Sequence, residues 1–185
     1  CYRLRVRGRD NIPRSGAAII ACNHISYMDA LILMVAIRRP LRFIMYYKIF
    51  RIPVLRYIFK SARAIPIAGR NEDAALFRQS FEDVHTALAG GDIVAIFPEG
   101  ELTRDGEIGV YRRGIEKMLE RDPVSVIPVA IDNLWGSLFS HAGGLMKGGP
   151  RKWFARITVQ IGVPLPPETT AAELKEATQR LLDKQ

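Results

Sequence analysis

A polar segment between two apolar runs constrains this chain more than any other stretch. The segment Asn-His-Ile-Ser-Tyr-Met-Asp occupies residues 23–29, after the apolar run 17–22 and before the apolar run 30–37. A short apolar run that stops at Asn-His and resumes as a longer apolar segment predicts a strand, a turn and a helix. In an α/β protein this arrangement exposes polar side chains at the carboxyl end of a strand, where such folds bind ligands.

The spacing inside this segment gives two interpretations. Residues five apart on a helix point about 140° away from each other, so His24 and Asp29 can meet only if His24 lies in the turn and Asp29 in the first helical turn. A capping box offers a different reason for the pattern, with Ser26 as N-cap and Asp29 three residues later. Both interpretations start the helix at the same place, but the capping box leaves Asn23 and His24 unexplained.

Size and composition favour a single domain over residues 1–185. The chain has 185 residues, of which 48% are hydrophobic, and this is enough for a core. We find no linker and no internal repeat. Because the chain begins with Cys rather than Met, and Tyr2 already begins a strand pattern, we expect it to be a piece of a longer polypeptide. The two cysteines, Cys1 and Cys22, and the absence of metal-ligand spacing predict a reducing compartment and no metal site.

The charge predicts an acidic partner. Lys and Arg number 27 against 19 Asp and Glu, which gives a net charge of +8. Nucleic acid, an anionic lipid surface, a phosphorylated substrate or an acidic carrier protein would all fit, and a solvated basic face without a function is a further alternative. No apolar run reaches the ~18–20 residues that span a bilayer, so any membrane contact is expected at the surface.

Residues 41–60 combine basic and aromatic residues without one acid. We expect a buried strand over 41–45, followed by a helix over 47–60 that faces a membrane or lines an acyl chain. The residues predicted to make this contact are Tyr47, Lys48, Phe50, Arg51 and Arg56. A core helix is the alternative interpretation, and no nucleic-acid-binding motif is present, so nucleic acid is not an expected partner.

The remaining patterns alternate between strands and helices. Strands are expected over 2–7, 17–22, 64–67, 92–97, 124–131 and 157–163, and helices from about 27 to 39, from about 72 to 89, after Gly114 and after the capping box of Thr170 and Glu173. A glycine-containing loop is expected over 132–152, without a nucleotide-binding role. The alternation favours an α/β fold with a central mixed, largely parallel sheet flanked by helices.

A second polar turn follows the predicted strand 92–97. Glu99 and Gly100 lie there, so the acid would reach the same sheet edge as His24. The loop after them carries Arg104, and the arginines at 112 and 113 precede a helix, which makes an anion site plausible.

Three motifs in order resemble the glycerolipid acyltransferases of the lysophosphatidate type. Asn23-His24 with Asp29 resembles their Asn-His-four-residues-Asp motif, Phe97-Pro98-Glu99-Gly100 their third motif, and residues 126–131 (Val-Ile-Pro-Val-Ala-Ile) their fourth. Two departures stand out: Arg104 is shifted within the third motif, and the second motif (residues 65–70) lacks its acid, with Arg70 displaced by one. The Ile-Pro-Ile sequence and residues 132–137 resemble bacterial acyltransferase modules fused to other domains, such as 2-acylglycerophosphoethanolamine acyltransferase.

The resemblance implies a reaction and a set of site residues. A fatty acyl group would pass from acyl-CoA or acyl-ACP (acyl carrier protein), a co-substrate rather than a bound cofactor, to a hydroxyl of a lysophospholipid or acylglycerol phosphate. His24 would act as general base and Asp29 would orient it. Substrate would be bound by Asn23, Arg70, Glu99, Gly100 and Arg104. We expect a peripheral location on the cytoplasmic side of a membrane.

Two alternatives remain open at this point. A non-catalytic module could bind anionic lipid or an acidic carrier and use His24 only structurally. A hydrolase would pass the acyl group to water through the same dyad.

Overall fold

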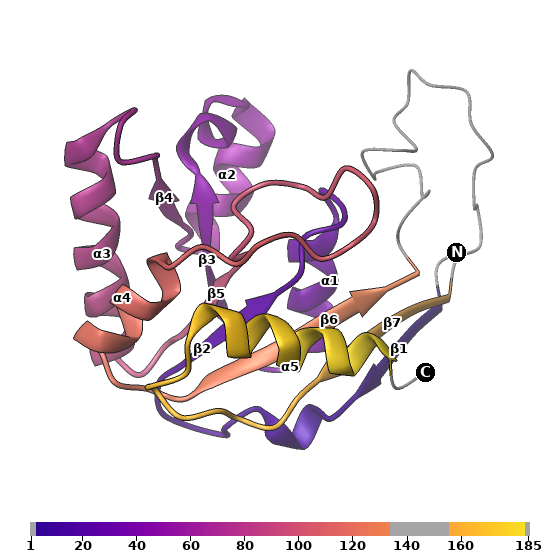
Figure 1. Cartoon of the computed structure of the whole chain (residues 1–185). Helices are drawn as coiled ribbons and strands as arrows, with labels where there is room; N and C mark the ends of the chain where they lie inside the picture. The colour runs from indigo at the N-terminus through magenta and orange to yellow at the C-terminus, as the bar shows by residue number, and fades with distance from the viewer. Residues whose placement is uncertain (1–2, 134–155, 184–185) are drawn as a thin grey trace.

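The computed structural model describes residues 3–133 and 156–183, and in this part of the chain a seven-stranded sheet forms the centre (Figure 1). The strands are β1 (Arg3–Arg7), β2 (Ala18–Cys22), β3 (Leu41–Tyr46), β4 (Ile65–Ile67), β5 (Ile93–Ile96), β6 (Val126–Asp132) and β7 (Arg156–Ile161). The helices are η1 (Arg9–Asn11), α1 (Asp29–Ala36), η2 (Tyr47–Arg51), α2 (Pro53–Ser61), α3 (Ala74–Ala89), α4 (Gly114–Arg121) and α5 (Ala171–Asp183).

The sheet is mixed and largely parallel, as predicted. Its strand order is β1-β7-β6-β2-β5-β3-β4, and only the β6–β7 pair is antiparallel. Strands β2 to β6 therefore run in one direction, and their carboxyl ends lie at one edge of the sheet. The turns that carry the predicted site residues follow β2, β4 and β5, so the topology brings them to this edge.

Helices cover the two faces of the sheet unequally. On one face α3, α4 and α5 pack against a cluster that includes Ile19, Val94 and Val126. On the other face α1 packs against Ile20, Phe43 and further residues of five strands. Figure 1 shows α5 in front of the sheet and α1 behind it. Strand β2 is buried at all five positions because both of its faces are covered, which confirms the interpretation of the unalternating run 17–22.

Helix α1 is shorter than predicted. It was expected to run from about Tyr27 to Arg38 or Arg39, but Ile37 is extended and ends it. The arginines were expected at its C-terminus. Instead Arg9 donates to the carbonyl oxygen of Ala36 at 3.0 Å, while Arg39 donates to carbonyl groups of the loops after η1 and after α3.

The segment 47–60 does not form the single helix that we predicted. The 3-10 helix η2 ends at Arg51, Ile52 is extended, and α2 then begins at Pro53. The residue before a proline is disfavoured in helical conformation, and this separates the two helices. From residue 134 on, the loop predicted over 132–152 lies outside the described residues.

Candidate active site

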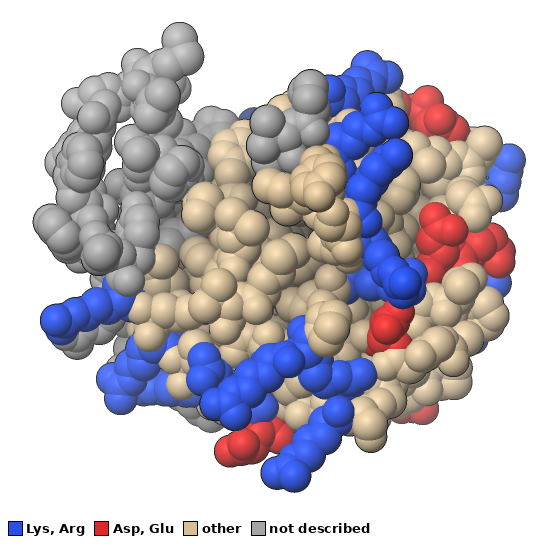
Figure 2. Space-filling view, turned by 180° about the vertical axis from the view of Figure 1, so that it is seen from behind, with Lys and Arg blue, Asp and Glu red and all other residues tan. Residues whose placement is uncertain are grey.

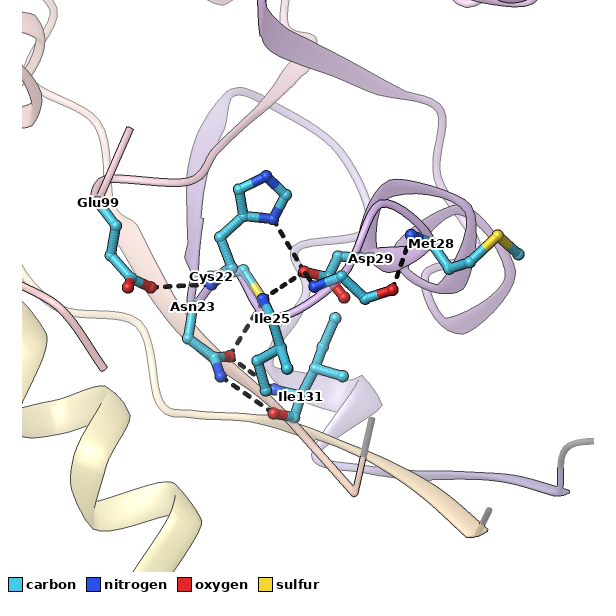
Figure 3. A network of polar contacts seen from close by, with 9 residues as sticks. Cys22, Asn23, Ile25, Met28, Asp29, Glu99 and Ile131 are labelled. Carbon is cyan, nitrogen blue, oxygen red and sulfur yellow. Dashed lines mark hydrogen bonds and ion pairs between the residues drawn. The ribbon is translucent and has the colours of Figure 1, made fainter. Parts of the chain in front are cut away.

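The turn after β2 brings His24 and Asp29 together. Nδ1 of His24 lies 2.9 Å from Oδ2 of Asp29, which is the first residue of α1 and is fully buried (Figure 3). The same Oδ2 accepts the backbone N–H groups of Ile25 at 2.7 Å and Ser26 at 2.9 Å. Three donors thus converge on one carboxylate oxygen and fix its position relative to the imidazole.

Ser26 is not the N-cap of α1, so the predicted capping box is only half present. The N-cap is Met28, and the hydroxyl oxygen of Ser26 accepts the N–H of Met28 at 3.2 Å. The Asp29 carboxylate does accept the Ser26 N–H, as a capping box requires. The reason for the difference is that the turn continues for two more residues before helical geometry begins at Asp29.

The His24 ring is held on a second side by an aromatic ring. Its centroid lies 4.1 Å from that of Phe97, with an angle of 16° between the planes. The histidine side chain is 23% exposed. Because Nδ1 faces the carboxylate, the neutral tautomer with a proton on Nδ1 leaves Nε2 as the basic nitrogen.

Glu99 joins the backbone of His24 to that of Gly109 through two hydrogen bonds, which we name the Glu99 clamp. Its Oε1 accepts the N–H of His24 at 2.8 Å, and its Oε2 accepts the N–H of Gly109 at 2.8 Å. The carbonyl oxygen of His24 in turn accepts the N–H of Thr103 at 2.9 Å. Burial raises the pKa of the Glu99 carboxyl, and the hydrogen bonds from Gly109 and His24 act in the opposite direction. Glu99 therefore ties the loop after β5 to the turn after β2.

Gly100 leaves room for Arg112 to form a hydrogen bond with this loop. Gly100 has a φ of 73°, and a Cβ at this residue would lie 2.9 Å from Nε of Arg112. That Nε donates to the carbonyl oxygen of Glu99 at 2.8 Å. Gly100 is thus needed for its left-handed backbone and for the close approach of Arg112.

Asn23 joins the ends of two neighbouring strands. Its side-chain nitrogen donates to the carbonyl oxygen of Ile131 at 3.0 Å, and its Oδ1 accepts the N–H of Ile131 at 2.8 Å. The thiol of Cys22 also donates to Oδ1, at 3.6 Å. Burial raises the pKa of this thiol well above its usual value, and the charges of Asp29 and Glu99 raise it further. The thiol therefore remains protonated beneath the site.

The predicted role of Asn23 and Glu99 in binding substrate stays a prediction, but their contacts point elsewhere. Both side chains are buried, and their polar atoms engage backbone groups of Ile131, His24 and Gly109. These four backbone groups were missed by the sequence analysis, since an N–H or C=O partner has no residue-type signature.

The two predicted arginines lie on the surface of the same sheet edge. Arg70 is exposed in the turn after β4. Strand β4 is three positions from β2 in the strand order, about 14 Å at the usual strand spacing. Arg104 is exposed and pairs with Glu101 at 3.4 Å. Neither side chain contacts the dyad, so substrate binding by these arginines stays a prediction.

The predicted membrane-contact residues partly engage one another. Lys48 lies 2.7 Å from Glu72, which also accepts the hydroxyl of Tyr47, and Arg51 lies over the Tyr47 ring. The hydrogen bond from Lys48, more than any other contact, lowers the pKa of Glu72 to about 2. Phe50 packs against Phe59 of α2. Arg56 is exposed on α2. Their contact with a membrane stays a prediction.

The described residues provide neither a metal-binding cluster nor a membrane-spanning helix. They contain no cluster of three or more His, Cys, Asp or Glu side chains placed to hold a metal ion. None of the described helices has the length and apolar character needed to cross a bilayer.

A comparison with known protein families decides the affiliation of the chain. The profile of the family described as Acyltransferase matches residues 3–132, which include the dyad, the Glu99 clamp and β6. This chain belongs to the Acyltransferase family. The resemblance seen in the three motifs is thereby confirmed, whereas the similarity to fused bacterial modules stays a prediction.

Named relatives and a solved structure agree with the family. A 1-acyl-sn-glycerol-3-phosphate acyltransferase of Borreliella burgdorferi is 30% identical over 138 residues, which is 71% of this chain and 52% of that protein. The chloroplastic enzyme LPAT1 of Arabidopsis thaliana is 25% identical over 80% of this chain and 41% of its own length. The chain thus spans about half the length of these relatives. The crystal structure of the 1-acyl-sn-glycerophosphate acyltransferase PlsC from Thermotoga maritima has the same fold, with a TM-score of 0.76 at 19% identity, covering 98% of this chain and 71% of that one.

Proposed function

We propose that this chain transfers a fatty acyl group from an acyl thioester to a hydroxyl of an acylglycerol phosphate or related lysophospholipid. The observation that carries the proposal is the 2.9 Å contact between Nδ1 of His24 and the buried carboxylate of Asp29. The names of the relatives support an acylglycerol phosphate as the acceptor. Acyl-CoA and acyl-ACP both provide the thioester that this chemistry needs.

In the proposed mechanism His24 is the general base. Nε2 takes the proton of the acceptor hydroxyl while the oxygen attacks the thioester carbonyl carbon. The tetrahedral intermediate then collapses, the carbon–sulfur bond breaks, and the thiolate takes the proton from the imidazolium. Asp29 holds the tautomer and stabilises the imidazolium, as the acid does in a serine hydrolase triad, but the substrate supplies the hydroxyl. No acyl-enzyme forms.

The remaining motif residues act on position rather than chemistry in this proposal. Glu99 fixes the backbone N–H of His24. Asn23, the residue before His24, is joined by its side chain to the backbone of Ile131 in β6. A general base must lie within hydrogen-bond reach of the proton that it removes, so these clamps set the height of the imidazole above the sheet edge. Arg70 and Arg104, which are exposed beside that edge, are proposed to bind the phosphate of the acceptor.

We further propose that the chain works at the cytoplasmic surface of a membrane as a peripheral protein. Its net charge of +8 suits an anionic lipid surface. Both the acceptor and the acylated product are lipids, so a surface location would bring them to the sheet edge.

The test is an assay matrix of acyl-CoA and acyl-ACP against several lysophospholipids, with products identified by mass. Wild-type protein should acylate at least one acylglycerol phosphate, and His24→Ala should lower the rate by at least the ~10²–10⁴-fold of a lost general base. The matched control is His85→Ala, because His85 also contacts an aspartate, Asp122 at 2.6 Å, but is exposed outside the site. Acyl transfer by His24→Ala at the wild-type rate would refute the mechanism, and release of free fatty acid without an acylated lipid would favour a hydrolase.

A further inference from the structure

Helix α1 exposes a line of apolar side chains. Every residue after Asp29 in this helix is apolar. Leu31 and Val35 are 39% and 70% exposed, and Tyr27, in the turn before the helix, is 71% exposed. The spacing of four residues places Leu31 and Val35 on one side of the helix, about 6 Å apart along its axis, and Tyr27 precedes them in the turn. We name this line the α1 stripe.

The outward positions of α3 and α4 differ from the α1 stripe, whereas α2 also exposes two apolar side chains, Tyr57 and Ile58. The exposed residues of α3 include Arg78, Glu82 and His85, and those of α4 include Lys117 and Glu120. Single exposed apolar residues are common on soluble proteins, but a contiguous line of them marks a surface that contacts something apolar.

Cations border the surface around the α1 stripe on two sides (Figure 2). Figure 2 shows the face of the molecule that carries α1, with a broad surface free of charged groups bordered by Lys and Arg side chains on two sides and with Asp and Glu only towards its margins. At the C-terminal end of α1, Arg38 is exposed and Arg9 donates to the carbonyl oxygen of Ala36. An apolar centre with a cationic border complements a bilayer whose headgroups are anionic.

The α1 stripe adjoins the candidate active site. Tyr27 lies in the turn between His24 and Asp29, and α1 begins at Asp29 itself. A bilayer in contact with the α1 stripe would therefore present its headgroup layer next to the dyad. A lysophospholipid could then place its glycerol hydroxyl near His24 while its acyl chain stays in the lipid.

We infer that the α1 stripe seats this chain on an anionic phospholipid bilayer. This inference rests on the proposed function and identifies the docking surface, which is distinct from the segment 47–60 favoured by the sequence. There Tyr47 and Lys48 already contact Glu72, although Tyr57 and Ile58 of α2 are exposed as well. The α1 stripe differs from that segment because it begins in the turn between His24 and Asp29.

The experiment measures co-sedimentation with vesicles of equimolar phosphatidylglycerol and phosphatidylcholine. Wild-type protein should bind them, more weakly at high salt and more weakly to pure phosphatidylcholine. The variant Leu31→Gln/Val35→Gln should bind about tenfold less or weaker still, because it removes exposed apolar area that enters the lipid. The matched control is Val163→Gln, since Val163 is also 70% exposed but lies outside α1. Val163→Gln should bind as wild type.

Three results would overturn the inference: wild-type protein that does not bind these vesicles, a Leu31→Gln/Val35→Gln variant that binds as wild type, and a stripe that joins two copies of the chain. Light scattering during gel filtration detects the third, as a dimeric wild type and a monomeric variant. Thermal unfolding verifies that the variant is folded, and Val35→Gln alone serves if it is not. Acyl transfer to a substrate in detergent micelles should be unchanged in the variant, so a failure here is distinguishable from a failure of the proposed function.

Discussion

Replacement of Asp29 by Asn separates the charge of the dyad from its geometry. Oδ2 of Asp29 accepts the backbone N–H groups of Ile25 and Ser26 at 2.7 and 2.9 Å, as well as His24 Nδ1 at 2.9 Å. An amide nitrogen in this position would face three donors, so the asparagine is expected to keep its carbonyl oxygen there. The tautomer of His24 is then preserved, and the negative charge is what the variant loses.

The size of the effect follows from the contact distance. Two unit charges 2.9 Å apart attract each other by about 3–6 kcal/mol at an effective dielectric constant of ~20–40. This attraction acts on the imidazolium that forms during the reaction, so its loss corresponds to a rate lower by about 10²–10⁴-fold. The new NH₂ group would occupy the place of Oδ1, which is buried and without a hydrogen-bond partner among the described residues. We therefore also expect a loss of about 1–3 kcal/mol in unfolding free energy.

The assay compares initial rates of acyl transfer and urea unfolding for wild type, Asp29→Asn and Asp122→Asn. Asp122 is the matched control, because it contacts an exposed histidine, His85, in the same way. Asp122→Asn should keep the wild-type rate. A rate for Asp29→Asn within a few-fold of wild type would refute the role of the charge, and an equal loss in both variants would show that the effect is not specific to the site.

Two further substitutions test the supports of the site. Glu99→Gln should lose one of its two backbone hydrogen bonds, to Gly109 or to the dyad histidine. We expect it to lose with that bond about 1–3 kcal/mol of unfolding free energy and part of the activity. The control is Glu107→Gln, an exposed glutamate of the same loop, and equal effects of the two substitutions would contradict the role of Glu99. Gly100→Ala should destabilise more than Gly91→Ala, because both residues have a positive φ but only Gly100 has a side chain within 4 Å of the added Cβ. Each glycine substitution should lower the unfolding free energy by about 1–2 kcal/mol because of the left-handed backbone. Equal losses in urea unfolding would mean that the contact of residue 100 with Arg112 is unimportant.

Local patterns predicted much of this fold. The strand expected over 2–7 is present as β1, in which exposed and partly buried residues alternate, and the capping box of Thr170 and Glu173 is present in full at the start of α5. The α/β class and the mixed sheet followed from the order of such elements. The strand order could not be predicted, because it places β1 beside β7 and thus depends on contacts between the two ends of the described chain.

The candidate site was predictable where it depends on side chains close in sequence. His24 and Asp29 meet within one turn, so their spacing was sufficient. The contacts of Glu99 were not predictable, since it binds backbone N–H groups 75 and 10 residues away, and any residue except proline can supply such a group. The α1 stripe was missed because an apolar run looks the same whether it is covered on one side or on both.

The amide of Asn23 has a consequence for sequence variation at residue 131. It contacts the N–H and the C=O of Ile131, but not through the side chain of that residue. Any buried residue of suitable size could therefore take this position, except proline, which has no N–H to donate. A comparison of side chains among related sequences would suggest that any residue can stand at position 131. The two hydrogen bonds that join β2 to β6 nevertheless depend on the backbone N–H and C=O of that residue.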